Sequence, residues 1–474
     1  LNFFLTQDFP TGDPADNACG PAQNVECRGA DADQPTELTR QRDKLIAALA
    51  GLEADVIGLN ELENTTGVDP LSDPNGLVPG LNALLGAGTY DAIDTGTIGG
   101  DAIKVGLIYK PGVVTPVGDF ELLTSAVDPR FVDTLSRPVL AQTFEVNATG
   151  ARFTVAVNHL KSKGSACPGD PDTGDGQGNC NVTRQAAAQA LVDWLASDPT
   201  GSDDPDFLII GDLNSYTLED PIDAVLVGAD DTLGTADDYT NLIRKFQGEF
   251  AYSFVFDGQA GYLDHGLANS AIVDQVLDAS EWHINADEPD LLDYDTSFKS
   301  ATQDTFFEPN QFRSADHDPL VVTLCADLTA CAADRAEAVA EEIEELIAAN
   351  PGSALARRLE VVLKKVEDAV AELTGTPPDR HGAIVKLENA AGDVENAVKQ
   401  GLLDASDGET LLDGLARAAR LLPVDALEEA RGGDAGKIAD AEQALADGDA
   451  RRAAGDFKKA ITSYKQALSK AEGA

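Results

Sequence analysis

The sequence predicts an α+β fold followed by a C-terminal all-α helical bundle, and three observations support that prediction. Many short apolar runs, separated by turn-rich loops, fill residues 1–325. From about residue 333 the composition changes to Ala, Leu, Glu, Lys and Arg at helical spacing. With 474 residues, the chain is also too long for one small core. We therefore expect two domains, residues 1–325 and residues 326–474.

The first predicted domain contains more strand-like runs than helical patterns. Short runs rich in β-branched residues predict strands at residues 55–62, 104–110, 139–146, 152–160, 207–214 and 319–324. Apolar residues recur at helical spacing over residues 37–52 and 183–195. This balance is typical of an α+β or two-sheet architecture.

The second predicted domain consists of amphipathic helices. Residues 338–349, 354–373 and 383–399 each carry an apolar stripe, and Pro-Gly and Pro-Pro breaks separate them. The last segment, AAGDFKKAITSYKQALSKA, resembles one tetratricopeptide-type hairpin, but no second copy follows at a fixed period. Two roles stay open for this helical tail: it binds an unknown protein partner, or it packs on the first domain.

The charge of the chain is strongly acidic, with 82 Asp and Glu against 34 Lys and Arg. The acids are scattered, which favours a solvated surface adapted to saline surroundings. An enzyme acting on nucleic acid with this balance would need local basic residues, divalent cations or high salt. We therefore expect any activity on DNA to hold or rise up to several hundred millimolar salt. No stretch approaches the ~20 apolar residues of a membrane helix, so we expect no stable membrane insertion.

The six cysteines fall into three close pairs, and each pair brackets a polar loop. The pairs are Cys19 with Cys27, Cys167 with Cys180, and Cys325 with Cys331. This pattern favours short-range disulfides formed in an oxidising compartment. Metal binding is the weaker alternative, because no pair has the C-x2-C spacing of zinc sites. We therefore expect an extracellular or periplasmic protein.

Several predicted strands end in side chains that can hold a metal ion or a phosphate. Glu61 ends one strand, Asn158 and His159 another, and Asp212 and Asn214 a third. Two further segments contribute Asp264, His265, Asp316 and His317. The chain has only five histidines, and three of them stand in these segments. Because strand ends converge at the rim of a sheet, such residues predict a functional site.

The order of five motifs resembles that of the endonuclease/exonuclease/phosphatase superfamily. The motifs are NELEN at 60–64, NHLKSKG at 158–164, GDLNSY at 211–216, LDHGLA at 263–268 and SADHDP at 314–319. The sequence is most similar to the bacterial secreted branch, the extracellular nucleases related to deoxyribonuclease I. The resemblance covers about residues 1–325 and implies a four-layer α/β sandwich, in which two packed, mainly antiparallel sheets lie between outer helices. It also implies a metal-dependent nuclease of low sequence specificity that acts on DNA, with RNA left open.

The resemblance implies roles for the acidic residues and the histidines of these motifs. Glu61 and Asp316 are expected to bind Mg²⁺ or Mn²⁺, since hard carboxylate oxygens suit such ions. His317 is expected to contact the scissile phosphate and to act as general base. His159 is expected to pair with Asp264, which would raise its pKa and make it an imidazolium donor.

The remaining roles concern water and phosphate. Asp212 is expected to orient or deprotonate the attacking water, and Asn214 to donate to the phosphate or ligate the metal. Candidate phosphate contacts are Arg137, Asn158, Lys161 and Lys163. An ordinary solvated lysine is an equal interpretation of Lys163. Structural or surface positions are expected for His283 and His381, whereas His265 has no clear counterpart in the superfamily.

One departure from the superfamily pattern concerns its first strand, which ends in a metal-binding Asn. Here LNFF at 1–4 matches the part after that residue, so Asn2 is not the expected ligand. The expected Asn would fall before Leu1, and we therefore expect a truncated first strand. Whether this form is active is an open question at this point.

Three further questions remain open from the sequence, one about calcium and two about function. The acidic loops 228–239 and 170–179 are candidates for structural Ca²⁺, although neither fits EF-hand spacing and a plain acidic loop is the competing interpretation. A phosphodiesterase or phosphatase acting on a phospholipid or an inositol phosphate would share the scaffold, but it would be expected to carry apolar docking loops. A non-catalytic binding scaffold is the third possibility.

Overall fold

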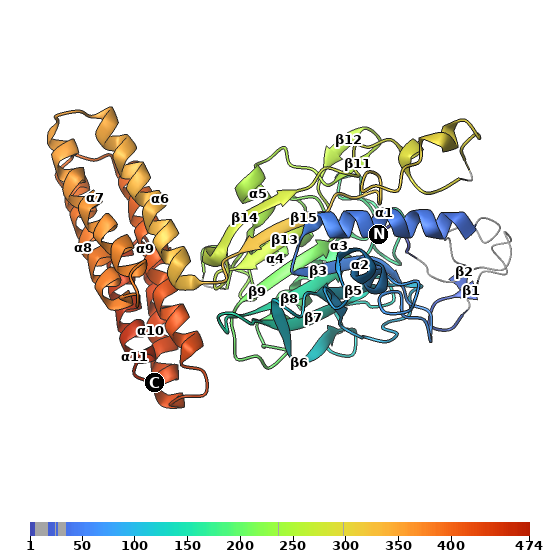
Figure 1. Cartoon of the computed structure of the whole chain (residues 1–474), viewed down its shortest axis with the longest axis horizontal. Helices are drawn as coiled ribbons and strands as arrows, with labels where there is room; N and C mark the ends of the chain where they lie inside the picture. The colour runs from blue at the N-terminus through green and yellow to red at the C-terminus, as the bar shows by residue number, and fades with distance from the viewer. Residues whose placement is uncertain (5–17, 24, 27–34, 236, 297) are drawn as a thin grey trace. The chain divides into compact units, whose positions relative to one another are not determined.

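The computed structural model describes residues 1–4, 18–23, 25–26, 35–235, 237–296 and 298–474 of the chain. The chain divides into two compact units (Figure 1). Unit 1 comprises Leu1–Asn147, Arg152–Leu233 and Asp237–Thr323. Unit 2 comprises Leu324–Ala474 and two short segments, Ala148–Ala151 and Gly234–Ala236.

The larger sheet of unit 1 has six strands in the order β10-β13-β9-β8-β7-β6. These strands are β6 (Val114–Leu123), β7 (Arg137–Val146), β8 (Arg152–His159), β9 (Phe207–Asp212), β10 (Tyr239–Asn241) and β13 (Asp264–Asn269). Strands β8 and β9 run parallel, and every other neighbouring pair is antiparallel.

A smaller antiparallel sheet has the order β3-β5-β4, with β3 at Val56–Glu63, β5 at Ile103–Tyr109 and β4 at Asp91–Ala92. Three further strand pairs complete the sheet structure of the described residues. They are β14 (Val276–Glu281) with β15 (Leu320–Leu324), β11 (Phe254–Phe256) with β12 (Gln259–Gly261), and β1 (Ala18–Cys19) with β2 (Val25–Glu26).

Successive side chains of the central strands point to opposite faces of the sheet, and each face packs into a separate hydrophobic core. Ile209 faces the cluster formed with helices α3 (Asn181–Leu195) and α4 (Asp220–Leu226), whereas Ile210 packs between the two sheets. Neighbouring side chains of a strand point to opposite faces, so β9 contributes to both clusters. Both faces of this strand are therefore buried, which explains its uninterrupted apolar run.

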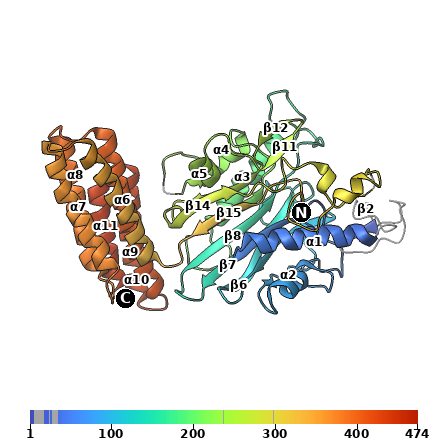
Figure 2. The same cartoon turned by 45° about the horizontal axis from the view of Figure 1, so that its top comes forward.

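The outer face of the smaller sheet is covered by α1 (Pro35–Leu52) and α2 (Leu77–Leu85), with Leu49 and Leu81 in that cluster. Unit 1 is therefore layered as helices, small sheet, large sheet, helices (Figures 1 and 2). This arrangement confirms the predicted α+β sandwich. The shorter helices of the unit are α5 (Leu242–Gln247), η2 (Val273–Gln275), η3 (Asp290–Leu292) and η4 (Gln303–Phe306).

Unit 2 is helical throughout its long segment, as predicted for the C-terminal region. Its helices are α6 (Leu328–Ala349), α7 (Ala354–Leu373), α8 (Arg380–Lys399), α9 (Ala405–Glu429), α10 (Ala435–Ala453) and α11 (Phe457–Ala471). Side chains of Asp327, Ser353, Asp379, Asp404 and Asp434 cap five of these helices by accepting backbone N–H bonds. Leu and Ala side chains fill the space between the helices.

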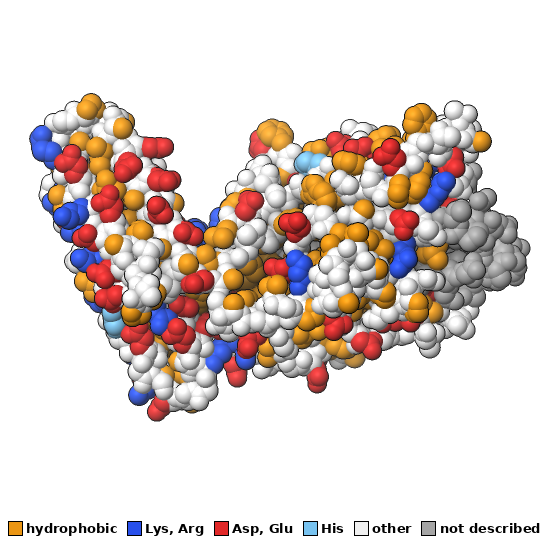
Figure 3. All heavy atoms as spheres, viewed as in Figure 1, with side chains coloured by type: hydrophobic (Ala, Val, Ile, Leu, Met, Phe, Trp, Pro, Cys, Tyr) orange, Lys and Arg blue, Asp and Glu red, His pale blue; other side chains and the backbone are white. Residues whose placement is uncertain are grey.

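Acidic side chains are scattered over the face of each unit that Figure 3 shows, in line with a sequence whose acids are not gathered in one block. None of the described helices is long and apolar enough to cross a bilayer.

Candidate functional site

The predicted site residues of three strands lie side by side on the large sheet. His159 at the end of β8 is the register partner of Asp212 at the end of β9, and Asp212 is the partner of Asp264 at the start of β13. Direct partners share a face of the sheet. Asp212 lies two residues beyond Ile210, so alternation turns these polar side chains toward the small sheet. Sheet order thus brings together residues that are about 50 positions apart in the sequence.

His317 joins this row through Asp264. Asp264 Oδ2 accepts hydrogen bonds from His317 Nδ1 at 2.7 Å and from Ser253 Oγ at 2.6 Å. Burial opposes the charge on His317, but the Asp264 carboxylate outweighs it and raises the pKa of His317 to about 10. Burial also opposes the charge on Asp264, and His317 with Ser253 nevertheless lowers the pKa of that carboxyl. The pair is therefore an imidazolium and a carboxylate at neutral pH.

The predicted pairing of His159 with Asp264 is wrong. Asp212 lies between them, so the two residues are two strand spacings apart, roughly 10 Å. Instead, His159 Nε2 lies 3.6 Å from Asp212 Oδ2 and 3.4 Å from Arg137 Nη1. Burial and then the positive charge of Arg137 hold the pKa of His159 well below its usual value. His159 is therefore neutral, and His317 is the imidazolium.

Asp212 occupies the centre of the row and is held by Asn214. Asp212 Oδ1 accepts the backbone N–H of Asn214 at 2.7 Å, and Oδ2 accepts its side-chain amide at 3.0 Å. Burial, together with the nearby Asp264 and Glu61 carboxylates, outweighs the attraction of His317 and raises the pKa of Asp212 to about 7. A carboxyl with such a pKa can accept a proton near neutral pH.

The side chain of Asn214 cannot donate to a phosphate in this arrangement. An amide has two hydrogens, and they are used on Asp212 and on the carbonyl oxygen of Leu160 at 3.0 Å. Asn214 adopts a left-handed backbone with φ of 49°, a conformation that is concentrated at functional sites. Of its two predicted roles, only metal ligation through the amide oxygen is compatible with these bonds.

Glu61 reaches the site from the small sheet through a bulge in β3. The pairing of β3 with β5 shifts register between Leu59 and Leu62, and Glu61 has φ of 63°. Its Oε2 accepts the backbone N–H of Phe3 at 2.9 Å. Its charge contributes to the raised pKa of Asp212, which places the two carboxylates near each other.

The prediction that Asn158 binds phosphate is wrong. Its side chain is fully buried, and its amide donates to the carbonyl oxygens of Ala156 at 2.9 Å and Ile210 at 3.5 Å. The main-chain carbonyl oxygen of Asn158 accepts a hydrogen bond from the side-chain amide of Asn60 at 3.1 Å. Asn158 therefore joins β8, β9 and the β3 bulge, and it positions the residues on either side.

A divalent ion at this rim is compatible with the donor set. Among the described residues, no group of three or more His, Cys, Asp or Glu side chains is close enough together to hold an ion. Mg²⁺, however, commonly uses one or two carboxylates and several waters. Glu61 and the half-buried Asp316 supply carboxylate oxygens, and the amide oxygen of Asn60 is buried without a hydrogen-bond partner among the described residues. An oxygen-only set of this kind fits Mg²⁺ or Mn²⁺.

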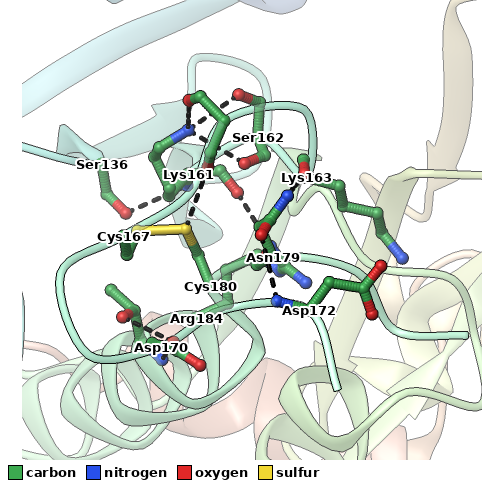
Figure 4. The surroundings of a disulfide bond; sticks show 12 residues. Ser136, Lys161, Ser162, Lys163, Cys167, Asp170, Asp172, Asn179, Cys180 and Arg184 are labelled. Atoms are coloured by element: carbon green, nitrogen blue, oxygen red, sulfur yellow. Dashed lines mark hydrogen bonds between the residues drawn. A yellow bond between two sulfur atoms is a disulfide. The ribbon is translucent and has the colours of Figure 1, made fainter. Parts of the chain in front are cut away.

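Two predicted cations lie beside His159. Arg137, the first residue of β7, is the register partner of His159, and its Nε lies 3.0 Å from Asp101 Oδ2 without hydrogen-bond geometry. The Lys161 ammonium donates to the carbonyl oxygen and hydroxyl of Ser162 at 2.9 and 3.0 Å and to Ser165 Oγ at 2.6 Å (Figure 4). Burial and then the charge of Arg137 lower the pKa of Lys161. The Arg137 guanidinium therefore brings a positive charge next to His159, whereas the three hydrogens of the Lys161 ammonium are used within its own loop.

Lys163, in contrast, is neither a solvated lysine nor a free phosphate contact. Its ammonium forms an ion pair with Glu219 and lies 4.6 Å from the centre of the Tyr216 ring. Burial lowers the pKa of Lys163. Its charge is compensated within the protein.

The loop that follows β8 is held by a disulfide and by a buried arginine (Figure 4). Cys167 and Cys180 are bonded, as are Cys325 and Cys331, so two predicted pairs are at bonding distance. The predicted pair of Cys19 with Cys27 lies partly outside the described residues. The aspartates of loop 170–179 accept bonds within the loop and from α3, as Asp170 does from the N–H of Thr183 at 2.8 Å.

Sequence reasoning missed Asp318, which shapes the loop that carries His317. Its side chain is completely buried, and its Oδ1 accepts backbone N–H bonds from residues 284, 285 and 286. Asn285 in turn donates to the carbonyl oxygen of His317 at 2.7 Å. The available signal was the second aspartate of SADHDP, which lies just before the strand predicted at residues 319–324. His283 also contacts Asp318, at 2.9 Å through Nδ1.

His265, which has no clear counterpart in the superfamily pattern, does not belong to the row of site residues. It follows Asp264 on β13, so its side chain points to the opposite face of the sheet. It is fully buried, its Nε2 lies 2.8 Å from the Ser215 carbonyl oxygen, and burial lowers its pKa to about 4.

Comparison with known proteins gives structural matches alone. No family model and no curated sequence matches the chain. Similar solved structures include an endonuclease/exonuclease/phosphatase family protein of Bacteroides thetaiotaomicron, which is 16% identical in sequence. That match covers 62% of this chain and 93% of the other chain, with a TM-score of 0.39. A mannosyl-6-phosphatase of the same species has 16% identity, 63% and 96% coverage, and a TM-score of 0.39. The human Nocturnin catalytic domain has 15% identity, 60% and 87% coverage, and a TM-score of 0.36.

Proposed function

We propose that this chain is a divalent-metal-dependent hydrolase that cleaves the phosphodiester bonds of DNA with low sequence specificity. The observation that carries the proposal is the row formed by His159, Asp212, Asp264 and His317, with Glu61 facing it and cations beside it. A neutral histidine, a carboxyl with a pKa of about 7 and an imidazolium stand next to one another in this row. Residues with such different proton affinities suit paired acid and base chemistry.

The geometry supports the role expected for Asp212 and favours a different proton-transfer role for His317. Asp212 is suited to orient the attacking water and to accept its proton, because its pKa lies near neutral pH. His317 carries a proton at neutral pH, so it donates to a phosphate oxygen or to the leaving group instead of acting as general base. Asp264 holds that imidazole by its Nδ1–H, which leaves the Nε2–H for substrate.

Binding of the phosphate would use Arg137, whose guanidinium lies beside His159 and supplies donors for phosphate oxygens. Lys161 would contribute only by exchanging its bonds to Ser162 and Ser165 for bonds to the phosphate. Glu61 and Asp316 would hold a divalent ion, which would supply positive charge to neutralise and polarise the scissile phosphate. No base-reading module is visible in the sequence, which supports low specificity.

The test is cleavage of supercoiled plasmid DNA by the purified chain with Mg²⁺ or Mn²⁺, beside an EDTA control. We expect nicking that requires metal, and a loss of at least about 100-fold in Asp212→Asn and in His317→Gln. His381→Ala is the matched control, because this histidine is exposed on α8 in unit 2 and pairs with Glu472. Equal rates in all three variants would contradict the assignment. Release of inorganic phosphate from monoesters, without DNA cleavage, would favour a phosphatase instead.

We also propose that the protein acts outside the cytoplasm. Two bonded cysteine pairs in polar loops and a scattered acidic surface support this location. Thiol titration of unreduced, denatured protein from its native source should find none of the six cysteines free. Six titratable thiols would contradict it.

A further inference from the structure

A β-hairpin beside His317 carries a row of aromatic rings. Strands β11 and β12 are joined by Asp257 and Gly258, whose φ values of 50° and 76° are those of a two-residue hairpin turn. Phe254 and Phe256 are two residues apart on β11, so they share one face of the hairpin. The Phe254 ring stacks on the His317 imidazole with centroids 4.4 Å apart and an interplanar angle of 29°.

The row continues outward from the site to solvent. The rings of Phe254 and Phe256 are 6.3 Å apart with an interplanar angle of 16°, and Phe256 is 66% exposed. The register partner of Phe254 is Gly261, where an added Cβ would lie 2.8 Å from Cε1 of Tyr216. Because direct partners share a face, the Tyr216 ring lies beside Phe254 on this same face. The glycine is thus required to let the ring approach.

Folding alone does not account for this row. A two-strand hairpin gains little stability from Phe256, because a ring that is 66% exposed to water contributes little hydrophobic burial. The nearly parallel rings leave a flat apolar face that begins at the imidazolium. Such a face suits a planar, aromatic ligand group attached to the phosphate that His317 would contact.

We propose that Phe256 and Phe254 form a stacking platform for an unpaired base of DNA, next to the phosphate bound at His317. This inference rests on the proposed nuclease function and adds the form of its substrate. Bases inside a duplex are already stacked, so the platform favours single-stranded or locally melted DNA. Stacking depends little on base identity and does not require positive charge, which suits a chain of net charge −48.

The test compares two single-stranded oligonucleotides of equal length and backbone charge, one of thymidine nucleotides and one of abasic nucleotides. Binding is measured by fluorescence anisotropy in the Asp212→Asn background with Mg²⁺, so that no cleavage is needed. We expect Phe256→Ala to weaken binding of the thymidine oligonucleotide by about 5- to 150-fold and to leave abasic binding unchanged. Phe256→Trp should restore the affinity.

Phe306→Ala is the matched control, because Phe306 is 54% exposed and lies on η4, away from the hairpin in sequence. Melting curves establish that each variant is folded. Two results would overturn the platform. One is equal affinity of the thymidine and abasic oligonucleotides for the chain that retains Phe256. The other is an equal loss of affinity for the thymidine oligonucleotide in Phe256→Ala and Phe306→Ala. Cleavage of plasmid DNA with either result would leave the nuclease proposal standing, whereas absence of both binding and cleavage would contradict both proposals.

Discussion

Replacement of Arg184 by Met should destabilise unit 1 and weaken its site together. Arg184 lies in the first turn of α3, where a cation opposes the helix dipole, so its charge does not serve the helix. Its fully buried guanidinium donates instead to the carbonyl oxygens of Lys161, Asn179 and Gln177 at 3.2, 2.7 and 2.8 Å, and to Ser215 Oγ at 3.0 Å. These acceptors belong to the NHLKSKG loop, the disulfide loop and the GDLNSY motif.

The magnitude follows from those bonds and from the cost of burial. Hydrogen bonds to a charged group contribute about 1.5–3 kcal/mol each, and desolvation of the guanidinium costs several kcal/mol. Burial lowers the pKa of Arg184, which shows that this cost is only partly offset. Methionine has similar length but no donors, so three carbonyls and a hydroxyl lose their partner. We expect Arg184→Met to lower the free energy of unfolding by about 3–5 kcal/mol.

Urea unfolding followed by tryptophan fluorescence measures this loss in unit 1 alone. Both tryptophans of the chain, Trp194 and Trp282, lie in that unit, and Trp194 shares α3 with Arg184. The matched control is Arg130→Met, since Arg130 is 40% exposed and pairs with two aspartates at the surface. The control should lose about 1 kcal/mol or less. A loss in Arg184→Met no larger than that of the control would refute the reasoning.

Three further predictions address charge, backbone and cross-linking. Glu281 is half-buried, and burial raises its pKa to about 7. The stability that its protonated form gives the folded state is complete below pH 4.5 and is lost as pH rises through 7. In thermal melts, Glu281→Gln should therefore be about 1–2 kcal/mol more stable than wild type at pH 8 and equally stable at pH 4. Gly211→Ala should lower the free energy of unfolding by roughly 3 kcal/mol and abolish cleavage, because φ of Gly211 is +116° and the added Cβ would lie 2.2 Å from the main-chain carbonyl oxygen of Asn158. A melting temperature close to that of wild type would contradict this prediction. Removing the Cys167–Cys180 bond by a double alanine substitution should cost about 2–4 kcal/mol in urea unfolding and loosen the Lys161 loop; unchanged stability would count against the structural role of the bond.

Local sequence patterns predict the central strands of unit 1 because both faces of those strands are buried. Residues 207–214 and 152–160 contain β9 and β8, and the helix predicted at 354–373 coincides with α7. The pattern fails where packing outweighs local preference. Helix α9 contains Pro423 and two glycines, residues that usually end helices, yet its apolar side is buried against α6, α8, α10 and α11.

The composition of the site could be predicted from sequence, but its internal pairing could not. Glutamate, aspartate and histidine at strand ends indicate a site wherever those ends converge. Which histidine meets which carboxylate depends on sheet order, and no local motif encodes that β9 separates β8 from β13. His317 arrives on a loop, so its contact with Asp264 depends on the long-range packing of that loop, including the buried Asp318. The contact between Phe254 and His317 could not be predicted for the same reason, since the hairpin that carries Phe254 has no sequence motif beyond a short turn.

The acidic surface and the Arg137 cation of the site can act on different length scales. Surface charges separated by more than about 8 Å are largely screened at physiological ionic strength. Arg137, by contrast, lies 3.4 Å from His159 and would act on a bound phosphate at contact distance, where salt screens little. Repulsion of DNA by the scattered acids would therefore fade with salt faster than local attraction at the rim. Stacking on Phe256 would be insensitive to salt as well, so a net charge of −48 is compatible with a nucleic-acid substrate in saline surroundings.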